Sequence, residues 1–177
     1  MTEEFLTVDN PLRLNYKWAA GPYLGKFLTE LRDKEKLWAV RCPKCHRLLF
    51  PPRIVCGKCH VKAPEFPQDW VEMSGKGYLD GWVKISAPQM NPATGEIKPD
   101  PYLHGNFILD EEAQFSHFLG VVPDSEEESK LQRGLRVEME MKPPGERTGE
   151  VTDIKYFKVL WDEPLKKLGK SVSPADM

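Results

Sequence analysis

Two closely spaced pairs of cysteines constrain the fold of this chain more than any other feature. Cys42 and Cys45 form one CxxC pair, and Cys56 and Cys59 form a second after ten intervening residues. Two residues between thiols allow a tight turn to direct both sulfurs at one ion, and two such turns complete the tetrahedral shell that zinc accepts. The spacing therefore predicts one metal ion bound by all four cysteines in a zinc ribbon. Iron in a rubredoxin-like site is the alternative.

A histidine follows each pair, so His46 and His60 also complete the CxxCH signature of c-type haem attachment. Ten intervening residues leave little room for two haems, and the start of the chain, Met1 to Glu4, lacks the basic residues of an export signal. A thioredoxin-like redox role would need a βαβ pattern, which is missing around the cysteines. We therefore interpret both histidines as solvated positions beside the metal-binding turns.

A four-thiolate site has no open coordination position, so the zinc is expected to be structural. It uses every cysteine of the chain, and any cysteine-dependent acyl transfer must come from another subunit. GxSxG, HExxH and Walker A motifs are missing from the sequence. His104 and His117 fall in expected strands, where packing is more common than acid–base work. The sequence predicts a protein that is not itself an enzyme.

The length and composition suit one ordinary domain with a small appendage. The chain has 177 residues and 16 prolines, which favours turns over long helices. It contains no apolar stretch of membrane-spanning length, and with no export signal at its start we expect a cytoplasmic protein without a membrane anchor. Disulfides are rare in that reducing compartment, which again favours metal binding by the cysteines.

Charge is unevenly distributed along the chain. Residues 32–62 contain nine Lys or Arg against two acidic residues, a net charge of +7, whereas the whole chain carries −2. The remainder therefore carries −9. Four thiolates around a divalent cation would leave the cysteine segment clearly positive, so an anionic ligand or partner is expected there.

The segment before the cysteines contains an extended arm and one helix. Residues 1–20 have no strong period, and Gly21-Pro22 offers a helix start. Apolar residues then fall on one helical face from Tyr23 to Leu31. This face either covers the core of the chain itself or docks on a partner protein.

Five strands are expected after the cysteines, with no long helix between them. They are indicated by period-two alternation over 78–85, 102–109, 115–122, 135–142 and 154–161. This count fits a small closed barrel of the OB type, with Trp70 to Met73 leading into the first strand. The predicted fold class is mainly β: an N-terminal helical arm, a four-cysteine zinc ribbon and a five-stranded OB-fold barrel.

The expected boundaries follow these changes of pattern. Residues 1–37 form the N-terminal arm and helix, 38–67 the zinc ribbon, 68–162 the barrel and 163–177 a C-terminal tail. The proline-rich connection 87–101 is long for a hairpin loop, and such loops are often functional.

Two shorter segments receive structural interpretations. The acidic segment 124–133 is interpreted as a solvated turn or short helix. Ser74 to Gly77 is interpreted as a strand turn, because the third glycine and the following helix of a phosphate-binding loop are missing.

The order of these features resembles a family of zinc-ribbon OB-fold proteins once catalogued only as a domain of unknown function and often encoded beside thiolases. Besides the cysteines, the resembling segments are 27–31, Phe50 to Arg53, Ser74 to Gly77, Pro101-Tyr102, Leu109 to Glu111 and Gly134 to Val137. Together they span about residues 20–160. Each is weak alone, but their order is specific.

The resemblance implies a non-catalytic accessory subunit that assembles with a thiolase-like enzyme, or with an aldolase or hydratase acting on acyl-CoA. In such complexes the ribbon and barrel help to hold the CoA part of the substrate. Together with the positive charge, this suggests Arg53 first, then Arg47, Lys58 and Lys62, as contacts for CoA phosphates. The alternative is that these charges solvate the ribbon or pair with acidic residues of a partner.

A single-stranded nucleic-acid-binding module is the competing interpretation, because zinc ribbons and OB folds both serve that function. Tyr78 and Trp82 are expected on one strand face, where they could stack on bases. The barrel segment is acidic, however, whereas a groove that follows a nucleic-acid backbone should be basic. A scaffold that binds no ligand is the third interpretation.

Overall fold

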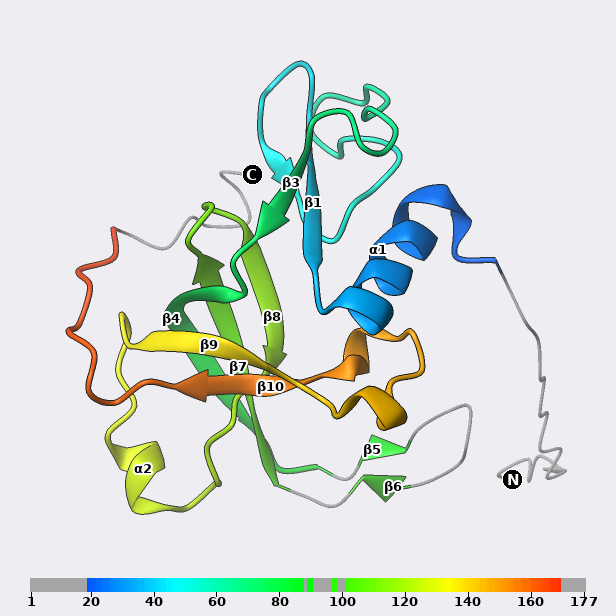
Figure 1. Ribbon diagram of the computed structural model, residues 1–177. Coiled ribbons are helices and arrows are strands. Elements are labelled where there is room, and N and C mark those ends of the chain that lie inside the picture. Colours follow the sequence, from blue (N-terminus) through cyan, green and yellow to red (C-terminus); the bar gives the residue numbers. More distant parts are fainter. Residues whose placement is uncertain (1–18, 88, 91–96, 99–100, 170–177) are drawn as a thin grey trace, which may run out of the picture.

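The structure, a computed structural model, describes residues 19–87, 89–90, 97–98 and 101–169. A small sheet lies at one end of the molecule, a barrel at the other, and one helix runs beside both (Figure 1). Residues 1–18 of the expected arm and most of the connection 87–101 lie outside the described residues, as does the end of the tail.

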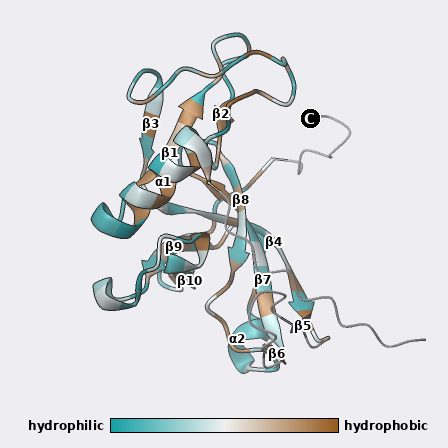
Figure 2. Cartoon of the chain, turned by 90° about the vertical axis from the view of Figure 1, so that its right-hand side faces the viewer, coloured by the Kyte–Doolittle hydropathy of each residue, from teal (hydrophilic) through white to brown (hydrophobic). Residues whose placement is uncertain are grey.

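Helix α1, Gly21–Lys34, begins with proline in its first turn and ends where Glu35 adopts a left-handed conformation. The backbone N–H of Glu35 donates to the carbonyl of Leu31 at 3.1 Å, which closes the last turn. The helix buries Tyr23, Phe27 and Leu31 against the rest of the chain. Figure 2 shows it lying beside β1 of the small sheet, with hydrophobic residues in both elements. Of the two roles considered for this face, the structure supports packing on the chain's own core.

The small sheet has the strand order β2-β1-β3. Its strands are β1 Leu37–Arg41, β2 Leu48–Leu49 and β3 Trp70–Met73. The sequence predicts that residues 70–73 lead into the barrel. They also form the third strand of this sheet, and all four of them pair with residues 37–40 of β1. Trp70 holds β3 in the small sheet. Its ring stacks on Tyr23 at 5.8 Å, and its indole N–H donates to Pro64 O at 3.1 Å.

The barrel has five strands in the order β10-β9-β4-β7-β8. They are β4 Lys76–Ile85, β7 Tyr102–Leu109, β8 Gln114–Phe118, β9 Arg136–Met141 and β10 Ile154–Val159. A parallel bridge between Leu119 and Phe157 joins β8 to β10, and the N–H of Gly120 donates to Phe157 O at 2.8 Å. The sheet is thereby closed with the strand order of an OB fold, which confirms the predicted fold class.

Short elements connect these strands. They are the antiparallel pair β5 Gln89–Met90 and β6 Ile97–Lys98, helix α2 Glu126–Ser129, and the 3-10 turns η1 Pro144–Glu146 and η2 Val151–Asp153. Helix α2 confirms the interpretation of the acidic segment. None of the helices in the described segments has the length and apolar character needed to cross a bilayer.

A β-bulge in β4 overturns one expectation about the barrel surface. The pairing of β4 with β7 shifts register between Leu79 and Gly81, so one extra residue, Asp80, is accommodated there. Tyr78 pairs with Ile108 on one face, whereas Trp82 pairs with Gly105 on the other. The prediction that the two aromatic rings share a face is wrong, because the bulge reverses the alternation between them.

The hydrophobic core of the barrel extends into helix α1 and the ribbon, and a second, smaller cluster lies at the ribbon end. Phe27 of α1 meets Phe50 of the ribbon edge-on at 5.7 Å, and Phe50 meets Phe115 of β8 at 4.9 Å. Phe115 in turn packs against Phe157 of β10 at 5.8 Å. This row of rings ties the helix, the ribbon and the barrel into one packed body.

Candidate metal centre and adjoining cleft

The four cysteines come together at the end of the small sheet, as predicted. All four Sγ atoms lie within 4.8 Å of one another, and Sγ of Cys45 is 3.8 Å from Sγ of Cys56. Zinc–sulfur bonds of about 2.3 Å in a tetrahedron require sulfurs about 3.8 Å apart, so the donor set fits a four-sulfur zinc site. Cys42 and Cys56 are buried, and the other two are half-buried.

Each CxxC turn is closed by the histidine that follows it. The N–H of His46 donates to Cys42 O at 3.0 Å, and the N–H of His60 donates to Cys56 O at 2.9 Å. Both histidines have positive φ, 59° and 54°, a conformation that His adopts more readily than most residues. Their rings are exposed, which confirms the interpretation of solvated positions beside the site.

The thiols strongly perturb one another's pKa values. The hydrogen bond with Cys45 is the largest cause raising the pKa of Cys59, to about 12, and burial adds to it. A backbone hydrogen bond from Arg47 lowers the pKa of Cys45. Four thiolates at this spacing need a cation to offset their repulsion. Because all four positions of a tetrahedral ion would be filled, such a site has a structural role.

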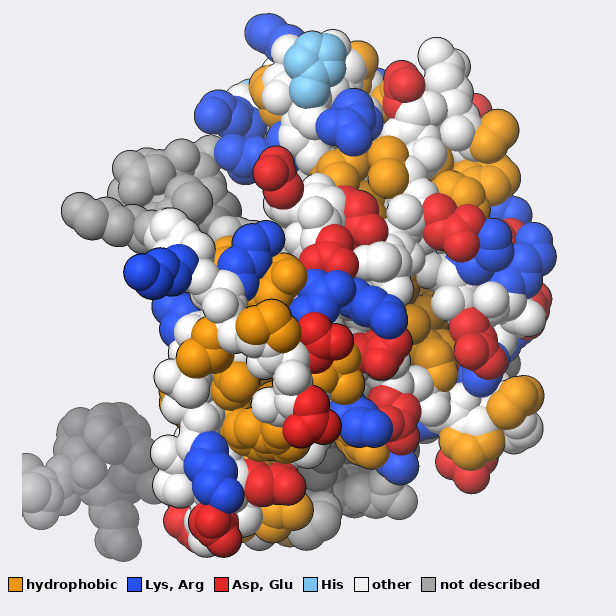
Figure 3. Space-filling view, turned by 60° about the vertical axis from the view of Figure 1, so that its left-hand side comes forward, with side chains coloured by type: hydrophobic (Ala, Val, Ile, Leu, Met, Phe, Trp, Pro, Cys, Tyr) orange, Lys and Arg blue, Asp and Glu red, His pale blue; other side chains and the backbone are white. Residues whose placement is uncertain are grey.

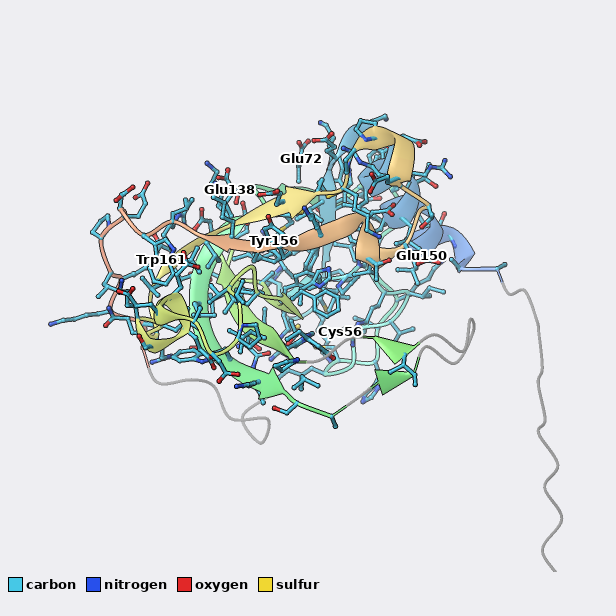
Figure 4. All side chains as sticks on the ribbon, turned by 90° about the horizontal axis from the view of Figure 1, so that it is seen from below. Cys56, Glu72, Glu138, Glu150, Tyr156 and Trp161 are labelled. Atoms are coloured by element: carbon cyan, nitrogen blue, oxygen red, sulfur yellow. The ribbon has the colours of Figure 1, made fainter. Side chains whose placement is uncertain are left out.

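A cleft of about 490 Å³ lies between the ribbon and the hairpin that joins β7 to β8. It is lined by Arg47, Leu48, Leu49, Phe50, Arg53, Cys56, Gly57, Lys58, Glu112, Ala113 and Gln114. The metal site is adjacent, since Cys56 belongs to both. In the view from below, Cys56 lies apart from Glu138 of β9 and Tyr156 of β10 (Figure 4). The lining residues Glu112 to Gln114 place the cleft on the β7–β8 side of the barrel.

Three of the four cations singled out from the sequence line this cleft. Arg47, Arg53 and Lys58 converge there, and within the described part of the chain none of them forms an ion pair. Lys62 is not brought to the cleft: its Nζ lies 2.8 Å from Oε1 of Glu65, and that hydrogen bond raises the pKa of Lys62. Figure 3 shows Lys and Arg side chains at the ribbon end of the molecule and also over the rest of the visible face.

The sequence did not indicate that the β7–β8 hairpin and the apolar residues Leu48 and Leu49 also line the cleft. Glu112 and Gln114 come from the β7–β8 hairpin, more than 50 residues from the cysteines. Glu112 takes a positive φ of 66° in this turn, and its N–H donates to Leu109 O at 2.9 Å. The contact between Phe50 and Phe115 places the hairpin against the ribbon. Phe50 had been singled out in the sequence, but nothing there indicated its partner.

Other residues considered from the sequence have structural surroundings. His117 is buried; its Nδ1 accepts the N–H of Phe118 at 2.8 Å, so its Nε2 donates to Val151 O at 3.2 Å as a neutral ring. His104 packs edge-on against Phe118 at 5.9 Å. Gly75, with φ of 71°, forms the turn that leads into β4, as expected. These positions agree with the packing and turn roles proposed for them.

Comparison with known proteins identifies the ribbon. Residues 29–65 match the family model described as "ChsH2, rubredoxin-like zinc ribbon domain". This match covers both CxxC pairs and confirms the zinc ribbon inferred from their spacing. No curated protein sequence matches the chain.

Two solved structures resemble the chain at low sequence identity. One, titled "Ltp2-ChsH2(DUF35) aldolase", is 24% identical, with 68% of this chain and 84% of that chain covered and a TM-score of 0.47. The other, a protein of unknown function from the DUF35 family of Sulfolobus solfataricus, is 18% identical, with 78% and 84% covered and a TM-score of 0.48.

Proposed function

We propose that this chain is a non-catalytic zinc-binding subunit that assembles with a thiolase-like enzyme, or another enzyme acting on acyl-CoA, and holds the CoA part of the substrate. The convergence of Arg47, Arg53 and Lys58 at one cleft, without ion-pair partners in the described residues, carries this proposal. Three cations that face a single carboxylate in the cleft lining, Glu112, favour an anionic ligand. The family model matched by the ribbon and the sequence resemblance of the longer segment agree with it.

The cleft suits the chemistry of the nucleotide end of CoA. Its cationic side offers two guanidinium groups, whose planar forks match phosphate oxygens better than ammonium groups do. Its floor, Leu48 to Phe50, is apolar and can pack against a ring or an alkyl chain. A ligand with phosphates at one end and apolar parts beside them would use both surfaces.

The state of the cysteines explains why a partner would perform the chemistry. All four thiols converge on one metal site, so none of them is left as a nucleophile. Acyl transfer or carbon–carbon bond chemistry would then be performed by residues of the partner, with this chain contributing affinity for the coenzyme.

Calorimetry on the complex with the acyl-CoA enzyme tests the proposal. We expect Arg53→Ala to weaken CoA binding by about tenfold or more, since a hydrogen bond to a charged group contributes roughly 1.5–3 kcal/mol. The apparent KM for acyl-CoA should rise while the complex still assembles. The matched control is Lys62→Ala, which removes a ribbon cation that lies outside the cleft lining. Equal CoA affinity in both variants and the parent protein would exclude the cleft as the coenzyme site.

Binding measurements with fragments of CoA show which part of the coenzyme contributes most of the affinity. Pantetheine, which has no phosphate, should bind far more weakly than CoA, and added salt should weaken CoA binding further. A single-stranded oligonucleotide tests the nucleic-acid interpretation. That interpretation needs Tyr78 and Trp82 on one face, but the bulge in β4 places them on opposite faces. If the oligonucleotide bound more tightly than CoA and lost affinity in Arg53→Ala, the nucleic-acid function would replace the one proposed.

A further inference from the structure

The four cysteines of the metal site differ in their access to solvent. Cys42 and Cys56, the first of each CxxC pair, are 0% and 1% exposed, and we refer to them as the inner thiols. Cys45 and Cys59, the second of each pair, are half-buried, and we refer to them as the outer thiols. The solvent-facing side of the site therefore offers one sulfur from each turn of the ribbon.

The outer thiols lie in a cationic part of the chain. Between Glu35 and Glu65 there is no acidic residue, whereas there are seven Lys or Arg residues. Lys44 and Lys58 directly precede the outer thiols, and neither forms an ion pair within the segments that the structure describes. Reactive cysteines are partly exposed and surrounded by positive charge, whereas buried structural cysteines are inert. The outer thiols meet both conditions, and the inner thiols fail the first.

The close spacing of the sulfurs favours disulfide formation after a first oxidation. Binding to a metal keeps a thiol in the thiolate form, which is the form that peroxide oxidises. An outer thiolate that attacks hydrogen peroxide becomes a sulfenic acid and releases hydroxide. A second thiolate then attacks the sulfenic sulfur, forms a disulfide and releases a second hydroxide. That second thiolate is near, since Sγ of Cys56 is 3.8 Å from Sγ of Cys45.

This reaction is balanced and removes half of the metal ligands. The two sulfurs lose two electrons in total, and these electrons reduce one peroxide to two hydroxides. Only two of the four thiolates then remain as ligands. A tetrahedral structural site needs all four, so the metal is released.

The cations of the cleft are attached to the same two metal-binding turns. The carbonyl of Arg47 accepts the N–H of Cys42 at 2.9 Å, which holds Arg47 against the first turn. Gly57 and Lys58 lie between the two ligands of the second turn and line the cleft. Loss of the metal therefore releases the backbone that places Arg47 and Lys58 at the cleft.

We infer that the outer thiols are sites of oxidation by peroxide, and that their oxidation releases the metal and abolishes anion binding at the cleft. The oxidation sites follow from the ribbon alone. The loss of coenzyme affinity rests on the proposed function, to which it adds a form of regulation.

Hydrogen peroxide added to the zinc-loaded full chain tests the oxidation sites. Released zinc is measured with a chromogenic chelator, and sulfenic acids trapped with dimedone are located by peptide mass spectrometry. Zinc release should accompany trapping at Cys45 or Cys59, and a dithiol reductant with added zinc should restore the site. Trapping first at Cys42 or Cys56 would overturn the assignment. So would intact zinc binding after the time in which the same peroxide oxidises free glutathione.

Histidine substitutions provide a matched comparison. The double variant Cys45→His and Cys59→His removes both outer thiols but keeps four ligands, because imidazole also binds zinc in such sites. Peroxide should release its zinc at least about tenfold more slowly than the zinc of the parent chain. Cys56→His keeps both outer thiols and should lose zinc at the parent rate. Equal rates in the double variant and the parent would overturn the assignment; if a variant fails to bind zinc, trapping on the parent chain decides.

Coenzyme binding after oxidation tests the consequence for the cleft. The chain is treated with peroxide, freed of peroxide with catalase, and then combined with the acyl-CoA enzyme for calorimetry. CoA affinity should fall by at least about tenfold and return after treatment with reductant and zinc. Unchanged affinity after complete zinc release would overturn the link between the metal site and the cleft. If the untreated complex binds no CoA, the proposed function and its regulation fail, while the oxidation sites stand.

Discussion

The ribbon and the barrel are stabilised in different ways, although they share one body. The ribbon end has its own small core of seven buried residues, two of which are the metal-ligating Cys42 and Cys56. The barrel core is a larger apolar cluster that needs no ion and extends into α1 and β1. In the ribbon the metal supplies the stability that burial supplies in the barrel.

The two regions also use their charges differently. In the barrel, Arg136 makes a bidentate pair with Asp110, and Arg133 pairs with Asp80. At the cleft, Arg47, Arg53 and Lys58 have no such partners in the described residues. Pairing in the barrel stabilises the fold, whereas the three cations at the cleft are the ones that we propose bind an anion.

Metal removal should give the largest effect and separate the two regions. A structural zinc contributes on the order of 10 kcal/mol to the folding of a ribbon, so a chelator or Cys45→Ser should unfold the segment around residues 42–63. The barrel should stay folded because its core contains no metal ligand, although it loses the contact between Phe50 and Phe115. Hydrogen exchange should show lost protection in the ribbon alone, and equal loss in β7 and β9 would refute the division. His46→Asn is the control: it suits the left-handed turn and removes no ligand, so zinc content should be unchanged.

Phe27→Ala should give the next largest effect and act on both regions at once. The side chain is fully buried and packs on Phe50, which links the ribbon to the barrel. Its truncation should cost about 3–5 kcal/mol in urea unfolding. Thr29→Ala, at an exposed position of the same helix, should change stability by less than about 1 kcal/mol. A loss confined to ribbon protection, with the barrel unaffected, would contradict the shared core.

Asp110→Asn should give a smaller and pH-dependent effect in the barrel. The hydrogen bonds from Arg136, at 2.5 and 2.7 Å, lower the pKa of Asp110 in the folded protein. The carboxylate therefore stabilises the fold above the unfolded pKa of about 3.9, and this contribution is lost as pH falls through the lower folded value. Since Asp110 is partly exposed, about 1 kcal/mol is expected at pH 7. Parent and variant melting temperatures should converge in acid; a constant difference across pH would exclude the ion pair as the cause.

Features that depend on short segments could be predicted from the sequence. The metal site follows from turns within residues 42–59, where four residues of backbone set each pair of sulfurs. Strict alternation over 135–142 predicted a strand that the structure has as β9. The start of α1 at Gly21-Pro22 was equally local. In each case the residues that decide the structure are neighbours in sequence.

Features that depend on which segments meet could not be predicted. Asp80 shifts the register of β4 by one residue, which moved Trp82 to the opposite face from Tyr78. Phe50 packs on Phe115, and Glu112 of the β7–β8 hairpin lines the same cleft as Arg53; no local period encodes that contact. The spacing of the cysteines thus determined the metal site. The packing of Phe50 on Phe115, which are distant in sequence, decided that the cations beside that site would share a cleft with the β7–β8 hairpin.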